Sequence, residues 1–150
     1  MLRVVRSHPG LHATVVFLVR EYLIEHHRGG LPADLTDEDR DYLSGLARDL
    51  ESGAVTGWVS FDGGQYTGTV VRSGDGEVGR LWVRPAFRRT GFASMLLDAA
   101  MTEPGWWMSV SRSNEPARAL VSGRNALVAG IHPDEPEYDR WVDSKEVAAA

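Results

Sequence analysis

Hydrophobic positions in the first thirty residues indicate a short strand followed by a segment with helical spacing. Residues 2–7 (LRVVRS) are typical of a short strand that stops at Pro9-Gly10. Apolar residues then recur at helical spacing until the chain reaches Arg28-Gly29-Gly30; they are Val15, Leu18, Val19, Tyr22 and Leu23. This pattern predicts a strand followed by a helix that ends near residue 28.

A second helix is indicated by its start signal as well as by its spacing. Thr36 followed by Asp39 fits a capping box in which Asp takes the place usually held by Glu. An inward apolar stripe follows, formed by Leu43, Leu46, Ala47 and Leu50. Gly45 lies inside this stripe and costs about 1 kcal/mol relative to Ala, which makes this the weaker of the two helical segments.

From Ala54 the pattern changes to strands joined by glycine-rich turns. The segments AVTGWVSF (54–61), QYTGTVV (65–71) and EVGRLWV (77–83) are separated by DGG and SGDG. Such turns favour tight antiparallel hairpins. We therefore expect three consecutive antiparallel strands.

In the last third of the chain, helices and strands alternate. A helix is expected from Gly91 to about Thr102, and WWMSVS (106–111) follows as a buried strand. Asn114 opens a further helix that stops around Asn125, where the left-handed conformation is accepted. ALVAGI and YDRWVDS, joined by HPDEPE, predict a final hairpin, and the tail EVAAA is expected to fray.

Together these elements predict a single domain over residues 1–150 of the α/β (α+β) class. It would hold a central mixed, mostly antiparallel sheet of about seven strands flanked by about four helices. A chain of 150 residues is long enough for one sizeable core. Its composition, 43% hydrophobic and 25% charged, is that of a globular protein.

Composition also excludes several classes of function. The chain has no cysteine, so disulfides, thiolate metal sites and cysteine nucleophiles are excluded. The net charge of −5 argues against nucleic acid as a partner. TVVFLV, an apolar run near the start, is too short for a membrane span or a signal peptide, so a cytoplasmic location is expected. His26 and His27 point about 100° apart on a helix, which disfavours a shared metal ion, and no metal site is expected.

The junction between the third of these strands and the following helix carries an unusual concentration of charge. Arg84, Arg88 and Arg89 precede the small residues Gly91 and Ala93. The first N–H groups of a helix have no internal partner and lie at the positive end of its dipole, so such a turn suits a phosphate. Arginines at a surface turn can equally be solvated. The sequence contains neither the triphosphate loop nor the three-glycine dinucleotide turn.

The order of elements, together with LWVRP, AF and RRTGFA, resembles the GNAT superfamily of acyl-CoA-dependent N-acyltransferases. The characteristic turn of that family reads Arg/Gln-x-x-Gly-x-Gly/Ala, and Arg88, Gly91 and Ala93 match it in register. The resemblance covers essentially the whole chain and is strongest from Glu77 to Val121. It implies that acetyl-CoA is the co-substrate.

The resemblance also implies which residues hold that co-substrate. Main-chain N–H groups of the turn would hold the pyrophosphate, at Arg88, Arg89, Thr90, Gly91, Phe92 and Ala93. The pantetheine arm would lie along the preceding strand and pair with the backbone of Leu81, Trp82 and Val83, as a peptide pairs with a strand edge. Asn114 matches a family Asn that binds the arm, although it is equally explained as a helix N-cap.

By resemblance the reaction is transfer of an acetyl or other acyl group to a primary amine by direct attack in a ternary complex. Glu77 stands where family members often keep a carboxylate that acts as the base, although it directly follows a turn and could simply be solvated. The family's proton-donating Tyr is replaced here by Val121. A water, Tyr138 or Ser111 could serve instead, or the thiol, of pKa about 8.5, could leave as the thiolate.

The replacement at Val121 leaves a second hypothesis open, a non-catalytic CoA-binding or protein-interaction module on the same scaffold. Acidic stretches, DLTDEDRDY and DEPEYD, occur where the family places its acceptor pocket. They would favour a cationic amine, either a small molecule or a peptide, although such stretches are usually solvated. A homodimer is compatible with the sequence.

Overall fold

The structure is a computed structural model that describes residues 2–28, 35–124, 126–131 and 137–143, excepting the side chains of residues 26–28, 127 and 131. The described residues form the seven strands and four α-helices that the sequence pattern predicts, and one short 3-10 helix that it does not. In chain order these are β1 (Leu2–Arg6), α1 (His12–Arg28), α2 (Asp37–Ser52), β2 (Val55–Asp62), β3 (Gln65–Ser73), β4 (Val78–Val83), η1 (Pro85–Phe87), α3 (Phe92–Ala100), β5 (Trp107–Ser111), α4 (Glu115–Ser122), β6 (Ala126–Ile131) and β7 (Tyr138–Asp143).

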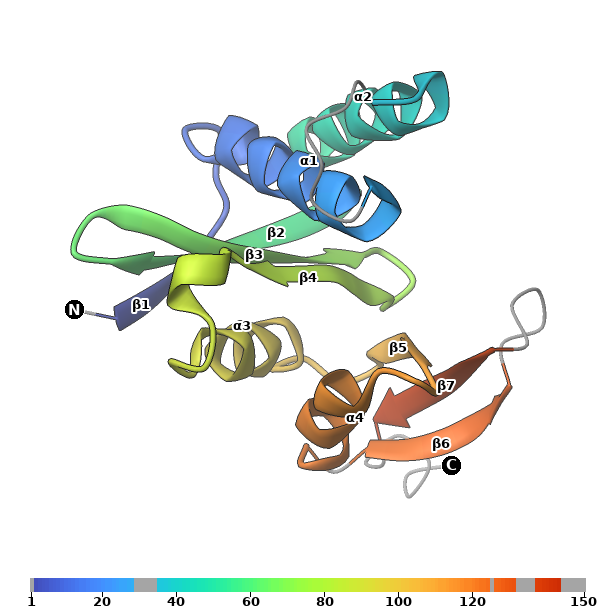
Figure 1. The fold of residues 1–150 in the computed structure, drawn as a ribbon. Helices are drawn as coiled ribbons and strands as arrows, with labels where there is room; N and C mark the ends of the chain where they lie inside the picture. Colours follow the sequence, from blue (N-terminus) through green and yellow to red (C-terminus); the bar gives the residue numbers. More distant parts are fainter. Residues whose placement is uncertain (1, 29–34, 125, 132–136, 144–150) are drawn as a thin grey trace.

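The strands form two antiparallel sheets in place of the single sheet expected from sequence. One sheet has the order β1-β2-β3-β4 and the other β5-β7-β6. They meet at one parallel bridge between Glu77 and Trp107, where the Trp107 N–H donates to the Gly76 carbonyl at 3.0 Å. Beyond this bridge β4 and β5 separate, which leaves an edge of β4 without a neighbouring strand in the described chain (Figure 1).

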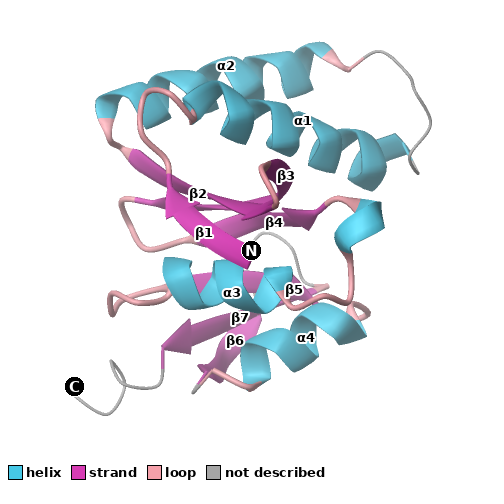
Figure 2. Cartoon of the chain, turned by 90° about the vertical axis from the view of Figure 1, so that its left-hand side faces the viewer, coloured by secondary structure: helices cyan, strands magenta, loops and turns pink. Residues whose placement is uncertain are grey.

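The two faces of the first sheet are covered by different helices. Figure 2 shows α1 and α2 together on one face and α3 on the other. Each face has its own apolar core, because strand side chains alternate between faces. Val15 and Leu18 of α1 and Leu46 of α2 belong to the core between these helices and the sheet. Leu96, Leu97 and Val110 belong to the core that α3 shares with the second sheet.

The predicted capping box at the start of α2 is confirmed. The Asp39 N–H donates to the Thr36 hydroxyl at 3.0 Å, and the Thr36 N–H donates to the Asp39 carboxylate at 3.3 Å. Gly53 ends the helix in the left-handed conformation, with φ of 81°. An N-cap of this kind contributes about 1 kcal/mol.

Some sequence predictions fall outside the described residues. They concern Asn125, the loop at 132–136, the tail at 146–150 and the side chains of His26 and His27. The α4 helix itself ends at Ser122 with Gly123 as its C-cap, a little before the stop expected around Asn125.

Candidate active site

The pairing of β3 with β4 contains a bulge, which lies next to the exposed edge of β4. Thr69 pairs with Trp82 whereas Val71 pairs with Gly79, so Val70 faces two residues of β4, Arg80 and Leu81. Arg80 has a φ of 55°, a left-handed conformation that is uncommon for a residue other than glycine. Bulges bend a strand and often lie beside functional sites. The bend here accompanies the separation of β4 from β5.

The hydrogen-bond pattern shows which backbone groups the free edge of β4 presents. The Arg84 N–H donates to the Thr67 carbonyl of β3 at 2.8 Å. Because main-chain groups alternate in direction along an antiparallel strand, Trp82 also directs its peptide groups to β3, and Leu81 and Val83 direct theirs outward. The Val83 carbonyl accepts from Arg88 Nε at 2.8 Å. The groups left for a ligand along this edge are therefore Leu81 N–H, Leu81 C=O and Val83 N–H.

The turn between β4 and α3 is held by its own backbone and by two aromatic rings. N–H groups of Phe87 and Arg88 donate to the carbonyls of Arg84 and Pro85, at 2.8 and 3.4 Å. The Phe87 ring packs edge-to-face on Phe92, with centroids 6.3 Å apart. The Thr90 hydroxyl donates to the Phe87 carbonyl. These contacts fix the path of the chain without using the N–H groups that follow.

Past the turn, a run of main-chain N–H groups lacks an acceptor. Within the described residues, the N–H groups from Arg89 to Ser94 have no hydrogen-bond acceptor, and Gly91, the N-cap of α3, makes no side-chain cap. The Met95 N–H is the first in α3 with a backbone partner, the Gly91 carbonyl at 3.0 Å. Six successive donors at the positive end of a helix have the geometry that suits an anion. The sequence analysis counted the Arg88 N–H among the groups expected to hold the pyrophosphate, but this N–H donates to the Pro85 carbonyl in the preceding turn.

Two residues of this turn adopt left-handed conformations. Arg89 has a φ of 63° and Gly91 a φ of 90°. Backbone in which such residues alternate with ordinary ones forms anion-binding concavities from successive N–H groups. A side chain at Gly91 would meet no atom within 4 Å, so conformation, not space, is what requires glycine there.

The two neighbouring arginines of the turn have different roles. Arg88 points back to α1, where its guanidinium donates to both carboxylate oxygens of Glu25 at 2.7 Å. It also lies 5.9 Å from the Trp82 ring centroid, and Trp82 Nε1 donates to Glu25 at 3.4 Å. The Arg89 side chain is exposed and makes no hydrogen bond or ion pair in the part of the chain described. Arg89 is therefore the guanidinium available to a phosphate.

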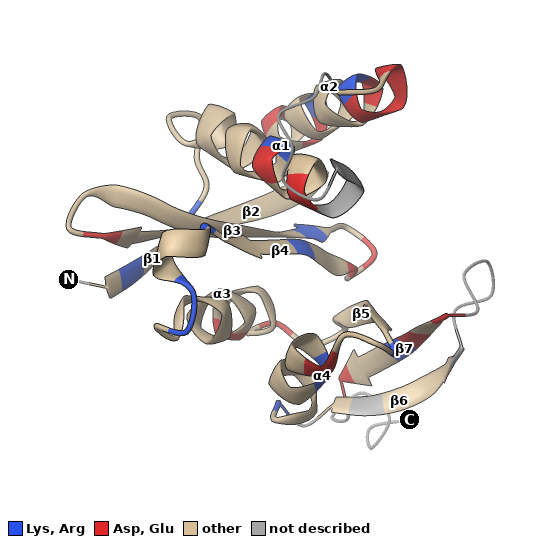
Figure 3. Ribbon diagram, in the orientation of Figure 1, with Lys and Arg blue, Asp and Glu red and all other residues tan. Residues whose placement is uncertain are grey.

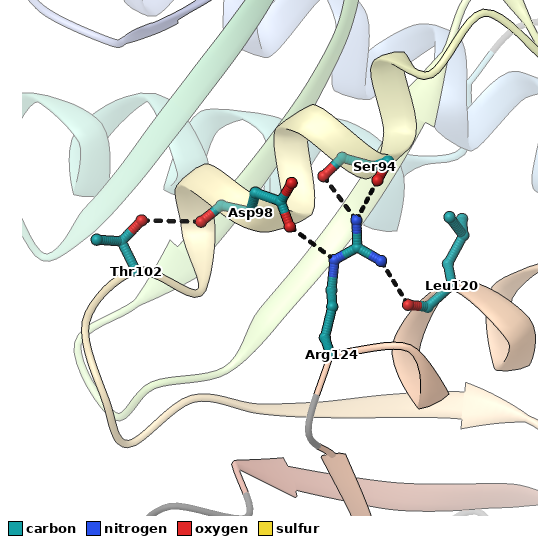
Figure 4. Close-up of polar contacts among 5 residues, drawn as sticks. All are labelled: Ser94, Asp98, Thr102, Leu120 and Arg124. Carbon is teal, nitrogen blue, oxygen red and sulfur yellow. Dashed lines mark hydrogen bonds and ion pairs between the residues drawn. The ribbon is translucent and has the colours of Figure 1, made fainter.

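Arg124 connects α3 to the end of α4 (Figure 4). Its guanidinium donates to the Ser94 carbonyl at 2.9 Å, to the Ser94 hydroxyl and to the Leu120 carbonyl at 2.6 Å, and it pairs with Asp98 at 3.1 Å. Only 14% of the side chain is exposed. Because Ser94 lies in the first turn of α3, Arg124 fixes the helix end that carries the free N–H groups.

Comparison with known proteins identifies the family. A family model described as acetyltransferase (GNAT) family matches residues 12–122. The chain belongs to the GNAT acetyltransferase family. Acyl transfer from coenzyme A is therefore its general chemistry. No curated protein matches it in sequence.

Solved GNAT structures share the fold over almost the whole chain. A GNAT acetyltransferase of Staphylococcus aureus has a TM-score of 0.68 at 10% identity, covering 96% of this chain and 99% of that one. RimL, the ribosomal L7/L12 α-N-protein acetyltransferase, solved with coenzyme A, gives 0.68 at 13% identity, covering 95% of each chain. The PaiA N-acetyltransferase of Thermoplasma acidophilum, also with coenzyme A, gives 0.65 at 12% identity, covering 95% and 99%.

In this GNAT domain, Asn114 acts as a helix cap. Its side-chain oxygen accepts the Ala117 N–H at 3.2 Å, and the residue is exposed at the start of α4. A contact of Asn114 with the pantetheine arm stays a prediction. Ser111 and Tyr138, the two hydroxyls considered as proton donors, lie opposite each other on β5 and β7. Val121 is fully buried in the core, so this position offers neither a proton nor access.

Glu77 is one of the residues that line a pocket between α2 and the first sheet. Its N–H donates to the Asp75 carboxylate at 3.0 Å, and its side chain is exposed. A hydrogen bond from the Ser73 hydroxyl, and then this one from Glu77, lowers the pKa of Asp75. The pocket has a volume of about 270 Å³; its lining includes Tyr42, Asp49, Glu77, Gly79 and Arg80.

Charges in the GNAT domain are distributed unevenly. Figure 3 shows acidic residues on α2 and basic residues in the turn before α3. The first turn of α2 holds three acids, Asp37, Glu38 and Asp39, of which Asp39 is engaged in the cap. In the second acidic stretch, Asp139 is buried and pairs with Arg112 at 2.9 Å, so it serves the fold.

The described residues hold neither a cluster of potential metal ligands nor a helix that could cross a membrane. No three potential metal-ligating side chains among His, Cys, Asp and Glu gather there. None of the described helices is long and apolar enough to cross a membrane.

Proposed function

We propose that this protein acetylates a primary amine by direct transfer from acetyl-CoA in a ternary complex. The observation that carries the proposal is the run of N–H groups from Arg89 to Ser94 without acceptors in the described chain. This run begins next to the free edge of β4. A diphosphate fits the first feature, and an amide-bearing arm fits the second. Arg89 supplies the adjacent positive charge.

The acceptor must lose a proton before it can attack. A primary alkyl ammonium has a pKa of about 10, so most of it is protonated at neutral pH. Glu77 is our candidate base, and because its side chain is exposed it would act through a water molecule. The ammonium first gives a proton through that water to Glu77. The neutral amine nitrogen then forms a bond to the thioester carbonyl carbon, the carbon–sulfur bond breaks with its electron pair going to sulfur, and the second proton of the nitrogen passes to the leaving thiolate or to solvent.

The leaving thiolate needs no buried acid. A thiol with a pKa of about 8.5 leaves tolerably as its anion. Ser111 and Tyr138, opposite each other at the separated end of β5, are candidates to supply a proton directly or through water. The fully buried Val121 supplies none.

Release of free thiol is the decisive measurement. With acetyl-CoA and a panel of small amines, amino acids and peptide N-termini, we expect thiol to appear only when the amine is added, together with the acetylated amine. Absence of thiol with every acceptor would instead support the second hypothesis, a module that binds CoA without turnover. Coenzyme A should raise the midpoint of thermal unfolding under either hypothesis.

A further inference from the structure

Arg80 is a partly buried arginine whose guanidinium contacts two tyrosines. Its Nε donates to the Tyr42 hydroxyl at 3.0 Å. Its guanidinium carbon lies 4.8 Å from the Tyr42 ring centroid and 5.7 Å from that of Tyr22. Burial lowers the pKa of Arg80, but interactions with Tyr42 and Tyr22 more than offset this, so the side chain stays charged.

Within the described residues, Arg80 has no carboxylate partner, unlike three other arginines that are at least partly buried or held in ion pairs. Arg88 pairs with Glu25, Arg112 with Asp139 and Arg124 with Asp98. No carboxylate of the described residues lies within 4.0 Å of the Arg80 guanidinium. A partly buried charge without a counter-ion is costly, and hydrogen bonds with Tyr42 and Tyr22 leave part of the five guanidinium N–H donors for another acceptor. The arrangement is suited to an anion from outside the chain.

Arg80 also lines the pocket beneath α2, so a ligand can reach it. The volume of about 270 Å³ lies near the lower end of small-molecule sites, which favours a small ligand. Two exposed carboxylates, Asp49 and Glu77, belong to the same lining. They attract an ammonium group, whereas a doubly charged phosphate would be repelled by both. A single negative charge beside an amine therefore fits this pocket.

We propose that Arg80 binds a carboxylate on the acceptor, so that the preferred acceptors are small aminocarboxylates whose amine lies toward Glu77. This inference rests on the proposed function for its amine, but the binding contact can be measured without turnover. The acidic stretches led us to expect a cationic amine as acceptor. With a carboxylate bound to Arg80, that acceptor would be a zwitterion. The left-handed backbone of Arg80, placed by the bulge, turns the side chain toward α1 and α2, where the acceptor would enter.

The test compares amines that differ only in the carboxylate. Free α-amino acids, their α-carboxamides, the decarboxylated amines and 2-aminoethylphosphonate are each added to wild-type protein with coenzyme A. Thermal protection reports binding, and thiol release from acetyl-CoA reports turnover. We expect at least one amino acid to protect the protein and to exceed its carboxamide roughly 10- to 100-fold in kcat/KM, the value of a charged hydrogen-bonded contact.

Variants then assign the preference to Arg80. Arg80→Gln should remove the preference, and Arg80→Lys should recover only part of it, because lysine lacks the planar fork. Arg40→Gln removes an exposed arginine of α2 that pairs with Asp37 and does not line the pocket, so it should leave the preference unchanged. Tyr42→Phe, a milder change, should reduce the preference by a smaller factor. If Arg80→Gln does not fold, the carboxylate preference of Tyr42→Phe serves as the test instead.

The outcomes separate this inference from the proposed function. Equal binding and turnover of carboxylates and carboxamides would overturn the role of Arg80 and leave acetyl transfer intact. Carboxylate-dependent protection that Arg80→Gln abolishes, without thiol release from any amine, would support the role of Arg80 and contradict catalysis. Protection by no aminocarboxylate at all, or stronger protection by the phosphonate, would overturn the inference.

Discussion

Arg88 and Glu25 lie 63 positions apart in the sequence and are joined by two hydrogen bonds of 2.7 Å. Arg88 belongs to the turn before α3, and Glu25 belongs to α1. Through the same guanidinium the Val83 carbonyl is held at 2.8 Å. One side chain thus connects the last residue of β4, the turn before α3 and helix α1, which lies on the face of the sheet opposite α3.

Replacing Glu25 with Ala should loosen that turn. Both side chains are about 40% exposed, 42% for Arg88 and 39% for Glu25, so solvent screening keeps the stability loss near 1 kcal/mol or below. We expect a several-fold rise in the Kd for coenzyme A, measured by calorimetry. Asp37→Ala, which removes an exposed ion pair with Arg40, is the matched control and should not change it. Unchanged affinity in Glu25→Ala would show that the turn holds its shape unaided.

Replacing Gly91 with Val should abolish binding of coenzyme A. The φ of 90° at Gly91 is strained for a β-branched residue, so the variant must rearrange the turn that presents the N–H groups. Gly63→Val is the control, because Gly63 also has a positive φ, of 58°, and open space around it, but lies in the β2–β3 hairpin. Each variant should lose roughly 1–3 kcal/mol of stability. If Gly91→Val binds coenzyme A like the wild type, the anion site lies elsewhere.

Local signals in the sequence predicted most of the fold and the turn with free N–H groups before α3. The Thr36 capping box and the Gly91 turn could be read because their partners lie within a few residues. Contacts that complete the site join distant segments: Arg80 to Tyr42 over 38 positions and Arg124 to Ser94 over 30. No spacing rule reveals such pairs. The division into two sheets was missed for a related reason, since its bulge is at Arg80, an arginine that gives no turn signal.

Replacing Glu77 with Gln tests the proposed base. We expect kcat to fall roughly 10- to 100-fold at neutral pH while the Kd for coenzyme A is unchanged, because Glu77 lies outside the turn that binds the phosphates. The deficit should shrink at high pH, where more of the amine is already neutral. Asp49→Asn, in the same pocket, is the control for a general effect of removing negative charge. Equal losses in both variants would indicate electrostatic attraction of the acceptor instead of base catalysis.

Asp75 should make a small contribution to stability that depends on pH. Hydrogen bonds from Ser73 and Glu77 lower its pKa in the folded protein, so folding favours the charged form. The contribution is therefore present above the ordinary pKa of 3.8 and is lost as pH falls through the folded value. Asp75→Asn should be slightly less stable than wild type near neutral pH in urea unfolding, and the difference should vanish in acid. A difference that grows in acid would contradict this sign.

Replacing Arg124 with Met should damage both stability and binding of coenzyme A. The largely buried guanidinium satisfies the carbonyls of Ser94 and Leu120, and Met leaves both without these donors. We expect a loss of roughly 2–3 kcal/mol in urea unfolding and a weaker Kd for coenzyme A, measured where both proteins are folded. Asp98→Asn separates the contribution of the ion pair from that of the hydrogen bonds to carbonyls. The Asp98 side chain is 67% exposed, so its ion pair contributes about 1 kcal/mol at most. A stable Arg124→Met variant with wild-type affinity would show that α3 is positioned by its apolar face alone.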